Sequence, residues 1–374
     1  MPETIQLYGT AEESSRRFRH DVCFCLGSFS PRTKGSPMAR KSCTSSPDFF
    51  SSFLAAPPKS EVLERLATLI DWERLRGCLE QAYKFGGAGR EPVDPVMLFK
   101  LLLLERFYQL SDRDAVWMAR DSLSFRQFLG LGAGDNVPDD TTVVVFRRRI
   151  REAGLLDDLF AEVTVQLEQQ GIGVRKGHIK LVDATLVDAA VRPPRKPRAA
   201  DGEGGDGPER QPKAPLDPDA DFTVKNGKPH YGFKLHLGQD RETGLITNHV
   251  LTAASVHDSQ MFADLVDGTE GEVLADKGYD SRAARELVRS RGARASIMRR
   301  ARPGRELTPW QRGRNRSIAR MRGFIEGANA CLKRWRGCAR AVYRGMDRVM
   351  MQMTMGVMAF NLTRAVALER GRCA

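Results

Sequence analysis

The chain has 374 residues, 41% of them hydrophobic and 7% aromatic, which is enough for two or three domains with buried cores. Its 59 Lys and Arg residues against 47 Asp and Glu residues give a net charge of +12, and this excess favours an anionic partner. No apolar run reaches the roughly 18 residues that a membrane helix needs. The seven cysteines are scattered without a CxxC pair, which argues against a zinc ribbon or a disulfide scaffold. We therefore expect a cytoplasmic protein.

The first part of the chain divides into a tail and a helical region. Residues 1–59 are rich in Ser, Arg and Pro and show no sustained period, so we predict a disordered, basic, Ser-rich tail. Residues 60–155 show helical spacing of their apolar side chains, which predicts an all-helical N-terminal domain. Within this domain, Asp94, Ser111 and Ser122 are predicted N-caps.

The last helix of this domain is predicted over 139–151 and is basic at its end. Its basic residues are Arg147, Arg148, Arg149 and Arg151. Several short helices that end in a basic one are typical of a helix-turn-helix-like reader. On this interpretation residues 60–155 form a DNA-binding domain and the four arginines lie near the duplex. The alternative is a helical bundle whose arginines only face water, and the sequence favours neither.

The rest of the chain, over 172–368, alternates between strand and helix patterns. Strands are predicted at 178–190, 231–237, 245–251, 272–275 and 295–298. Helices are predicted at 259–266, 281–290, 310–335 and 349–368, with Asp258 and Asp280 capping the first two. Residues 192–220 hold seven Pro and four Gly, which indicates a linker or a surface insertion. This order predicts an α/β domain with a mixed sheet flanked by helices.

Positive charge is concentrated in the last quarter of the chain. Residues 285–345 hold 18 Lys and Arg residues and only three acidic ones. One interpretation is a solvated basic face. The other is that an anion covers the segment, because so one-sided a block repels itself, and nucleic acid is then the partner that fits.

Two aspartates stand out by their positions. Asp183 lies inside an apolar predicted strand, where a lone carboxylate is costly unless it is paired, protonated or bound to a metal. Asp276 lies where another strand ends, and active-site residues of open α/β sheets gather at such ends. Each also has a plain structural explanation, as a paired core aspartate and as the cap of a turn.

Glu326 stands out on the long predicted helix. Steps of three, four and seven residues return to the same helix face, so Glu326 shares one stripe with Arg322, Asn329 and Lys333. A carboxylate between cations suits a site that meets both a metal and a phosphate. The structural alternative is an exposed glutamate with an ordinary cation as its neighbour.

Three carboxylates in this order are typical of metal-dependent phosphoryl transfer. Hard divalent cations such as Mg²⁺ prefer oxygen ligands, and two ions about 4 Å apart can activate an attacking oxygen and stabilise a leaving one. No His/Cys cluster in the sequence competes for a softer metal. Such a site needs no histidine base, although His236 and His257 are candidates for that role.

Three local strings resemble the signature blocks of bacterial insertion-sequence transposases of the Asp-Asp-Glu class, in the insertion-sequence-five family. The strings are Val-Asp-Ala-Thr at 182–185, Leu-Ala-Asp-Lys-Gly-Tyr-Asp-Ser at 274–281, and the spacing of Arg322, Glu326 and Lys333. The segments 231–237, 256–260 and 94–131 are similar to that family as well. The resemblance covers about residues 60–365 and is specific.

The resemblance implies a ribonuclease-H-like catalytic domain over 172–368. It implies that Asp183, Asp276 and Glu326 are catalytic metal ligands, and that Arg322 and Lys333 are the cations around the glutamate that bind DNA. The implied cofactor is Mg²⁺, which Mn²⁺ can replace, as two ions. The implied partners are the terminal repeats of a mobile element and a target DNA. Because two DNA ends must meet, a homodimer or a larger assembly is expected.

The function expected on this basis is that of a transposase that cleaves DNA and transfers the strand. One alternative is a metal-dependent nuclease on the same fold that never joins ends. Another is a DNA-binding derivative that no longer catalyses, and the intact Asp183, Asp276 and Glu326 argue against it. Only the family resemblance separates the transposase from the nuclease.

Overall fold

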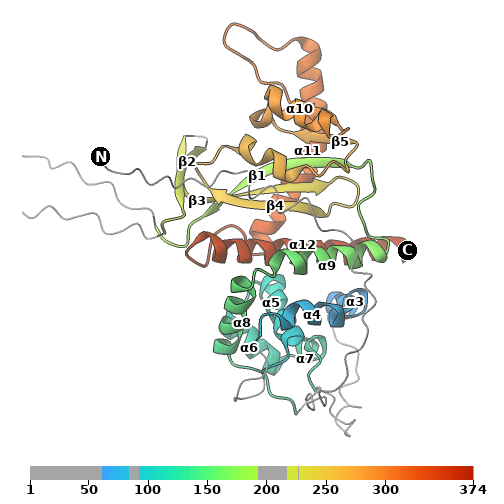
Figure 1. Cartoon of the computed structure of the whole chain (residues 1–374), viewed down its shortest axis with the longest axis vertical. Helices are drawn as coiled ribbons and strands as arrows, with labels where there is room; N and C mark the ends of the chain where they lie inside the picture. The colour runs from blue at the N-terminus through green and yellow to red at the C-terminus, as the bar shows by residue number, and fades with distance from the viewer. Residues whose placement is uncertain (1–60, 84–91, 133, 193–216, 226, 374) are drawn as a thin grey trace, which may run out of the picture. The chain divides into compact units, whose positions relative to one another are not determined.

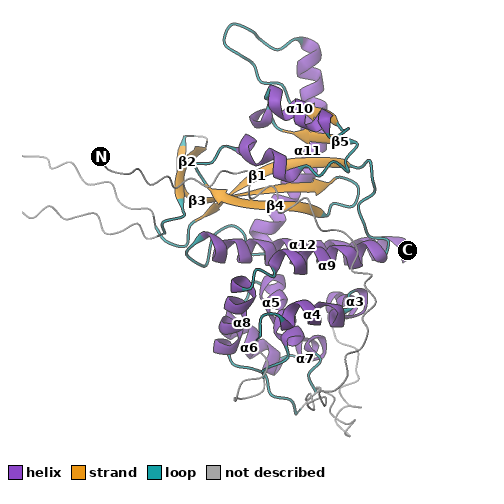
Figure 2. Cartoon of the chain, in the orientation of Figure 1, coloured by secondary structure: helices purple, strands orange, loops and turns teal. Residues whose placement is uncertain are grey.

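The computed structural model describes residues 61–83, 92–132, 134–192, 217–225 and 227–373. The predicted tail at 1–59 and most of the predicted insertion at 192–220 lie outside the described residues. The described chain is a mixed α/β protein whose mixed sheet is flanked by helices (Figure 2). No helix in these ranges is both long and apolar enough to cross a membrane.

The first described part of the chain is helical, as predicted. Its helices are α3 (Glu61–Leu69), the 3-10 helix η1 (Trp72–Leu75), α4 (Arg76–Glu80), α5 (Pro95–Tyr108), α6 (Asp112–Asp121), α7 (Leu123–Leu129), α8 (Asp140–Glu152) and α9 (Leu156–Gln169). The predicted N-caps are confirmed, because the side chains of Asp94, Ser111 and Ser122 accept hydrogen bonds from backbone amides of the first turn. Helix α9 is absent from the prediction, although Leu159 and Val163 follow one buried helical face.

The described strands form one mixed sheet (Figure 1). They are β1 (Ile179–Asp188), β2 (Asp221–Lys225), β3 (Lys228–Asp240), β4 (Ile246–Ala253), β5 (Glu272–Ala275) and β6 (Arg294–Ile297). Strand β1 is central, antiparallel to β3 on one side and parallel to β5 on the other. Strand β4 pairs with β3 as the predicted hairpin, and β6 extends the parallel side. Strand β2, which pairs with the start of β3, is absent from the prediction.

The helices of this second part are η2 (Asp258–Leu265), η3 (Lys277–Tyr279), α10 (Arg282–Ser290), α11 (Pro309–Trp335) and α12 (Met346–Cys373). The helix predictions are confirmed within a few residues, but both predicted caps are wrong. His257 caps η2 in place of Asp258, because its imidazole accepts a hydrogen bond from the first turn. Ser281 caps α10 in place of Asp280, whose carboxylate instead lies 2.6 Å from the guanidinium of Arg285.

A glycine of β3 lies where no side chain fits. Gly232 has a φ of 155° and pairs with Asp188 at the end of β1. A Cβ at this position would clash with the backbone oxygen of Val187 and lie 2.6 Å from the backbone nitrogen of Ala189. The close approach of the two strands therefore requires glycine here, and it helps to fix the register of β1.

A buried ion cluster fixes the other end of β1. Lys180 is fully buried, and its ammonium lies 2.7 Å from the carboxylate of Glu270 and 2.5 Å from that of Asp267. Both acids come shortly before β5 in the chain. The cluster therefore ties β1, which carries Asp183, to the start of β5, the strand that Asp276 directly follows.

Helix α12 contributes to two hydrophobic cores. Val349, Met353 and Val357 pack with the inward-facing residues of the sheet. Met351 and Met358 pack with the helices of the first part. The helix contacts β4 as well as α3, α5 and α9 (Figure 1). A helix that is apolar around most of its circumference is a buried one, and α12 is buried between two sets of partners.

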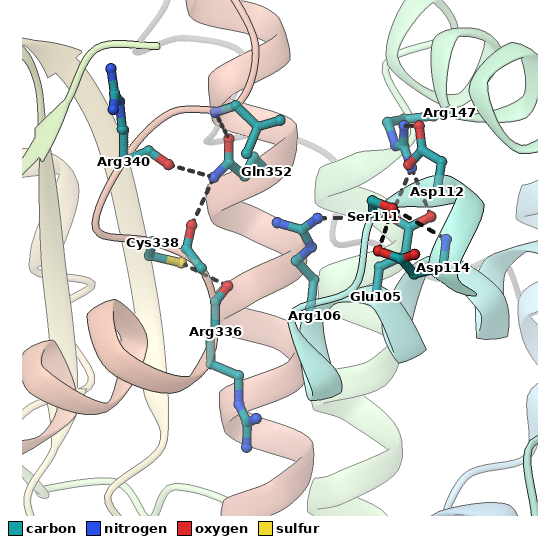
Figure 3. Close-up of polar contacts among 12 residues, drawn as sticks. Glu105, Arg106, Ser111, Asp112, Asp114, Arg147, Arg336, Cys338, Arg340 and Gln352 are labelled. Carbon is teal, nitrogen blue, oxygen red and sulfur yellow. Dashed lines mark hydrogen bonds and ion pairs between the residues drawn. The ribbon is translucent and has the colours of Figure 1, made fainter. Parts of the chain in front are cut away.

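The turn between α11 and α12 is held by the contacts drawn in Figure 3. Gln352 of α12 donates from Nε2 to the backbone oxygens of Gly337, at 2.8 Å, and Arg340, at 2.9 Å. Arg336 donates to the backbone oxygen of Phe107, near the end of α5, at 3.1 Å. The C-terminal end of α11 is therefore joined both to α12 and to the helical first part.

The buried His236 of β3 predicts how stability depends on pH. Its Nε2 lies 2.9 Å from Oγ1 of Thr252, and burial lowers the pKa of the imidazole to about 4. The unfolded chain binds this proton below about pH 6.5 and the folded chain only near its lowered pKa. The contribution of His236 to the free energy of unfolding should therefore fall as the pH drops through that window, by up to about 3 kcal/mol.

Urea unfolding of the wild type and of His236→Gln at several pH values between about 4 and 7 measures this loss, because the two pH dependences should differ by the contribution of His236. The readout is the slope with pH and not the absolute stability, which the substitution changes for other reasons. A variant with the same slope as the wild type would show that His236 does not carry the effect.

Candidate active site

The parallel pairing of β1 with β5 brings two of the three predicted acids together. Val182 pairs with Ala275, so Asp183 and Asp276, the next residue on each strand, are neighbours. Asp276 directly follows β5, and its side chain accepts a hydrogen bond from the backbone N–H of Lys277 at 2.6 Å. The geometry of the sheet thus places two carboxylates at the carboxyl end of β5.

Helix α11 presents two polar side chains to this pair. Arg322 donates from Nη2 to Oδ1 of Asp183 at 2.8 Å, and its Nη1 lies 3.7 Å from Oδ1 of Asp276. Asn329 donates from Nδ2 to Oδ2 of Asp183 at 3.0 Å. Both α11 side chains are buried. A single guanidinium therefore bridges the two aspartates, and a neutral amide holds the second oxygen of Asp183.

The charges of this pair favour a bound cation. Burial raises the pKa of Asp183, and the nearby carboxylate of Asp276 raises it further, whereas the guanidinium of Arg322 lowers it. Two carboxylates that repel each other are stabilised by positive charge between them. In this state Arg322 provides that charge.

Glu326 does not join the two aspartates in this state. Its side chain is exposed on α11, one helical turn from both Arg322 and Asn329. The described residues contain no group of three or more His, Cys, Asp or Glu side chains placed to hold one metal ion. The structure therefore brings together Asp183 and Asp276 but not the third predicted ligand.

Three buried polar atoms around the aspartates lack a hydrogen-bond partner among the described residues, namely Nε of Arg322 and two oxygen atoms. The two oxygen atoms are Oδ1 of Asn329 and the hydroxyl of Tyr279. Burial raises the pKa of Tyr279 well above its usual value, and the carboxylates of Asp258, Asp183 and Asp276 add to the shift. Buried polar atoms are usually satisfied, so these two indicate that the site is completed by something polar.

The donor set fits a hard divalent cation. Asp183 and Asp276 supply carboxylate oxygens for the ion, and the unpartnered oxygen atoms of Asn329 and Tyr279 can accept hydrogen bonds from its waters. Mg²⁺ and Mn²⁺ prefer such ligands and keep some of their waters, whereas a softer metal would need the sulfur or imidazole groups that are absent from this set.

Lys333 lies further along α11 and is half-buried. Burial lowers the pKa of its ammonium, and the neighbouring charge of Lys225 lowers it further. No ion pair joins it to Glu326 within the described part of the chain. The interpretation of Lys333 as the ordinary partner of the glutamate is therefore not supported by the geometry.

Arg147, one of the predicted DNA contacts, lies in a buried ion cluster. Its guanidinium lies 2.7 Å from the carboxylate of Glu105 and 2.6 Å from that of Asp112 (Figure 3). Only 12% of the Arg147 side chain and 2% of that of Glu105 are exposed. Its donors are turned toward α5 and α6, because a buried carboxylate there needs a cation. Arg147 thus joins α8 to α5 and α6 through ion pairs within the helical part.

The other three arginines of α8 differ from Arg147. Arg148 and Arg149 are exposed, and the guanidinium of Arg149 lies 5.0 Å from the centre of the Tyr83 ring. Arg151 is half-buried and pairs with Glu152 at 3.1 Å. Of the four, Arg148 and Arg149 are therefore the ones best placed to meet a phosphate.

Comparison with known families assigns both parts of the chain. Residues 51–149 match the family described as "Transposase domain (DUF772)", and residues 176–362, half of the chain, match the family described as "Transposase DDE domain". The chain belongs to the DDE transposase family. Among solved structures the chain also matches "Cryo-EM structure of piggyBac transposase synaptic complex with hairpin DNA (SNHP)", at 10% identity and a TM-score of 0.43, covering 84% of this chain and 74% of that one.

Membership of this family identifies the protein as a transposase, an enzyme that cleaves and transfers DNA with the help of a divalent metal. DNA is therefore a partner of this transposase, and the nucleic-acid interpretation of its basic residues agrees with that. The sequence prediction of a transposase is confirmed.

The sequence reasoning missed the role of Asn329, although it placed the residue on the stripe of α11. Its hydrogen bond to Asp183 joins residues 146 positions apart, so the helical period predicts its face but not its partner. The ion pair of Lys234 with Asp258, at 3.0 Å, was missed for the same reason.

Proposed function

We propose that this transposase binds the terminal inverted repeats of its own mobile element and acts through Asp183, Asp276 and Glu326 in a ribonuclease-H-like domain over 172–368. The observation that carries the proposal is the meeting of Asp183 and Asp276 on adjacent parallel strands beneath α11, the helix on which Glu326 lies. A mixed sheet with an antiparallel side and a parallel side agrees with a ribonuclease-H-like domain.

Each of the three acids has a distinct place in the proposed site. Asp183 comes from the centre of the sheet, and Asp276 from the carboxyl end of the neighbouring strand. Glu326 comes from the same helix as the two side chains that already touch Asp183. Because Glu326 is exposed, its side chain has to turn toward the aspartates before it can act with them.

The proposed cofactor is Mg²⁺, with Mn²⁺ as a substitute, and the proposed number of ions is two. Bound by these acids, the ions would activate the attacking oxygen and stabilise the leaving one. The side chains around Asp183 orient its carboxylate. Asn329 and Arg322 fix the carboxylate of Asp183, and Arg322 also neutralises part of the repulsion between Asp183 and Asp276.

DNA is proposed to lie over two basic regions. In the helical domain, at 60–155, Arg148, Arg149 and Arg151 are proposed to contact the terminal repeat. Around the active site the phosphates are proposed to lie along the basic segment 285–345, in which Arg299 and Arg316 are exposed. Phosphate contacts of this kind position a duplex without reading its sequence. Because two DNA ends must meet, we propose a homodimer or a larger assembly on DNA.

The test of the function is a joining assay with purified protein, Mg²⁺ and a labelled fragment that carries the ends of the element. Cleavage followed by covalent joining of the 3′ end to a target duplex is expected. Cleavage without any joined product, over the same range of target concentrations, would favour the nuclease. A control fragment with scrambled ends tests whether the terminal repeats are what the protein recognises.

Lys333→Ala tests the proposed phosphate contact near the active site. The lysine is half-buried and not paired with Glu326, so its charge is free to meet a phosphate. Its loss should weaken binding to all duplexes about equally and reduce the salt slope of log K by roughly one unit. Binding of cognate and random duplex at several salt concentrations measures this slope. A loss confined to the cognate sequence, or an unchanged slope, would contradict the phosphate role.

A further inference from the structure

Asn329 contacts the candidate active site in a way that differs from its neighbours on α11. It is only 8% exposed, and its Nδ2 lies 3.0 Å from Oδ2 of Asp183. Its own Oδ1 is buried and has no hydrogen-bond partner among the described residues. Burying an amide costs free energy unless both its nitrogen and its oxygen form hydrogen bonds. Packing alone therefore does not explain an asparagine at this position.

The two oxygens of Asp183 are held by donors of different charge. Oδ1 is bound by the guanidinium of Arg322 and Oδ2 by the neutral amide of Asn329. A divalent cation that approaches the carboxylate repels the guanidinium, because both carry positive charge. It does not repel the amide. The bond from Asn329 is therefore the one that can persist when a metal ion binds to Asp183.

We propose that Asn329 is a positioning residue of the metal site. Its Nδ2 keeps the carboxylate of Asp183 in the orientation that a cation needs, and its Oδ1 accepts a hydrogen bond from water that enters with the ion. Partners of this kind, which hold a ligand without touching the metal, typically change metal affinity by about 10–100-fold when they are removed. This inference rests on the proposed role of Asp183 as a metal ligand.

The place of Asn329 on α11 also connects it to Glu326. The residue is three positions after Glu326 on the same helix, so one rigid element carries both the third proposed ligand and the group that orients the first. A movement of α11 would therefore change Asp183 and Glu326 together.

The test measures Mn²⁺ binding directly, by calorimetry and by the electron paramagnetic resonance of the ion, with the full-length protein and no DNA. Asn329→Leu, which keeps the branched shape and loses both polar atoms, should weaken Mn²⁺ binding about 10–100-fold. Binding of terminal-repeat DNA in the presence of a chelator should stay unchanged, because that contact does not involve the metal.

A matched control comes from the same helix. Asn315 is another asparagine of α11, but its amide bonds the backbone of Arg299 at 2.9 Å and not a carboxylate. Asn315→Leu should leave the affinity for Mn²⁺ as it is in the wild type. If Asn329→Leu does not fold, Asn329→Ala removes the same two polar atoms with a smaller side chain and gives the same test.

Two results would overturn the inference in distinguishable ways. Mn²⁺ affinity within about two-fold of the wild type in Asn329→Leu, with weakened binding in Asp183→Asn, would show that Asp183 is a ligand but that Asn329 does not position it. Unchanged Mn²⁺ affinity in Asp183→Asn as well would instead remove the ligand role on which the inference rests.

Discussion

Replacing Asp183 with Asn is expected to reduce DNA cleavage by on the order of 10⁴-fold, while binding to DNA survives. Asp276→Asn and Glu326→Gln should have the same effect. Each change keeps the shape of the side chain but removes the negative charge that is proposed to hold the ions. The first two acids are already neighbours under Arg322, whereas Glu326 is exposed. Its variant is therefore the most informative of the three.

Cleavage of a labelled terminal-repeat fragment, with binding measured in parallel, tests these variants. Glu306→Gln is the matched control for Glu326→Gln, because Glu306 is also an exposed glutamate within the basic segment. It should cleave like the wild type. If Glu326→Gln also cleaved normally, the third ligand would have to be another residue. The exposed side chain of Glu326 would then have no part in the active site.

Replacing Arg147 with Met is expected to lower the free energy of unfolding by about 3–5 kcal/mol. The change leaves the carboxylates of Glu105 and Asp112 facing each other with most of their compensating charge removed. Removing one partner of a buried ion pair is costly because the other charge stays desolvated. Arg147→Met should therefore destabilise the helical part even in the absence of DNA.

Arg148→Met provides the comparison, since it changes the next residue of the same helix. Arg148 is exposed, so its loss should alter stability by no more than about 0.5 kcal/mol. It should reduce the salt slope of DNA binding by roughly one unit, as expected for a lost phosphate contact. Urea unfolding and salt-dependent binding separate the two variants. If Arg147→Met and Arg148→Met had equal free energies of unfolding, Arg147 would not be the structural residue of the two.

These two arginines show what the sequence could predict and what it could not. A helix over 139–151 is predicted from the local sequence, and α8 is found at 140–152. Which of its arginines is buried depends on Glu105 and Asp112, which are 42 and 35 residues away, and on how α5 and α6 pack. No local pattern contains that information.

The site shows the same division. The strand at 272–275 was predicted with its observed bounds, and Asp276 was placed at its end for a physical reason. That Asp183 is its neighbour depends on the pairing of β1 with β5, which joins residues about 90 positions apart. The state of Glu326 could not be predicted, because the same helix stripe carries buried and exposed residues and the sheet beneath decides which is which.

The place of α12 at the end of the described chain has a consequence for folding during synthesis. This helix is made after every other described helix and strand, yet it contributes side chains to two of the three hydrophobic cores of the described residues. A nascent chain that has completed the helical part and the sheet therefore still exposes apolar surface on both. Neither of these two cores can close before α12 is made, and we expect the parts that share α12 to unfold together. A fragment that stops before residue 346 should accordingly aggregate or be degraded, and it should not accumulate as a DNA-binding competitor of the intact enzyme.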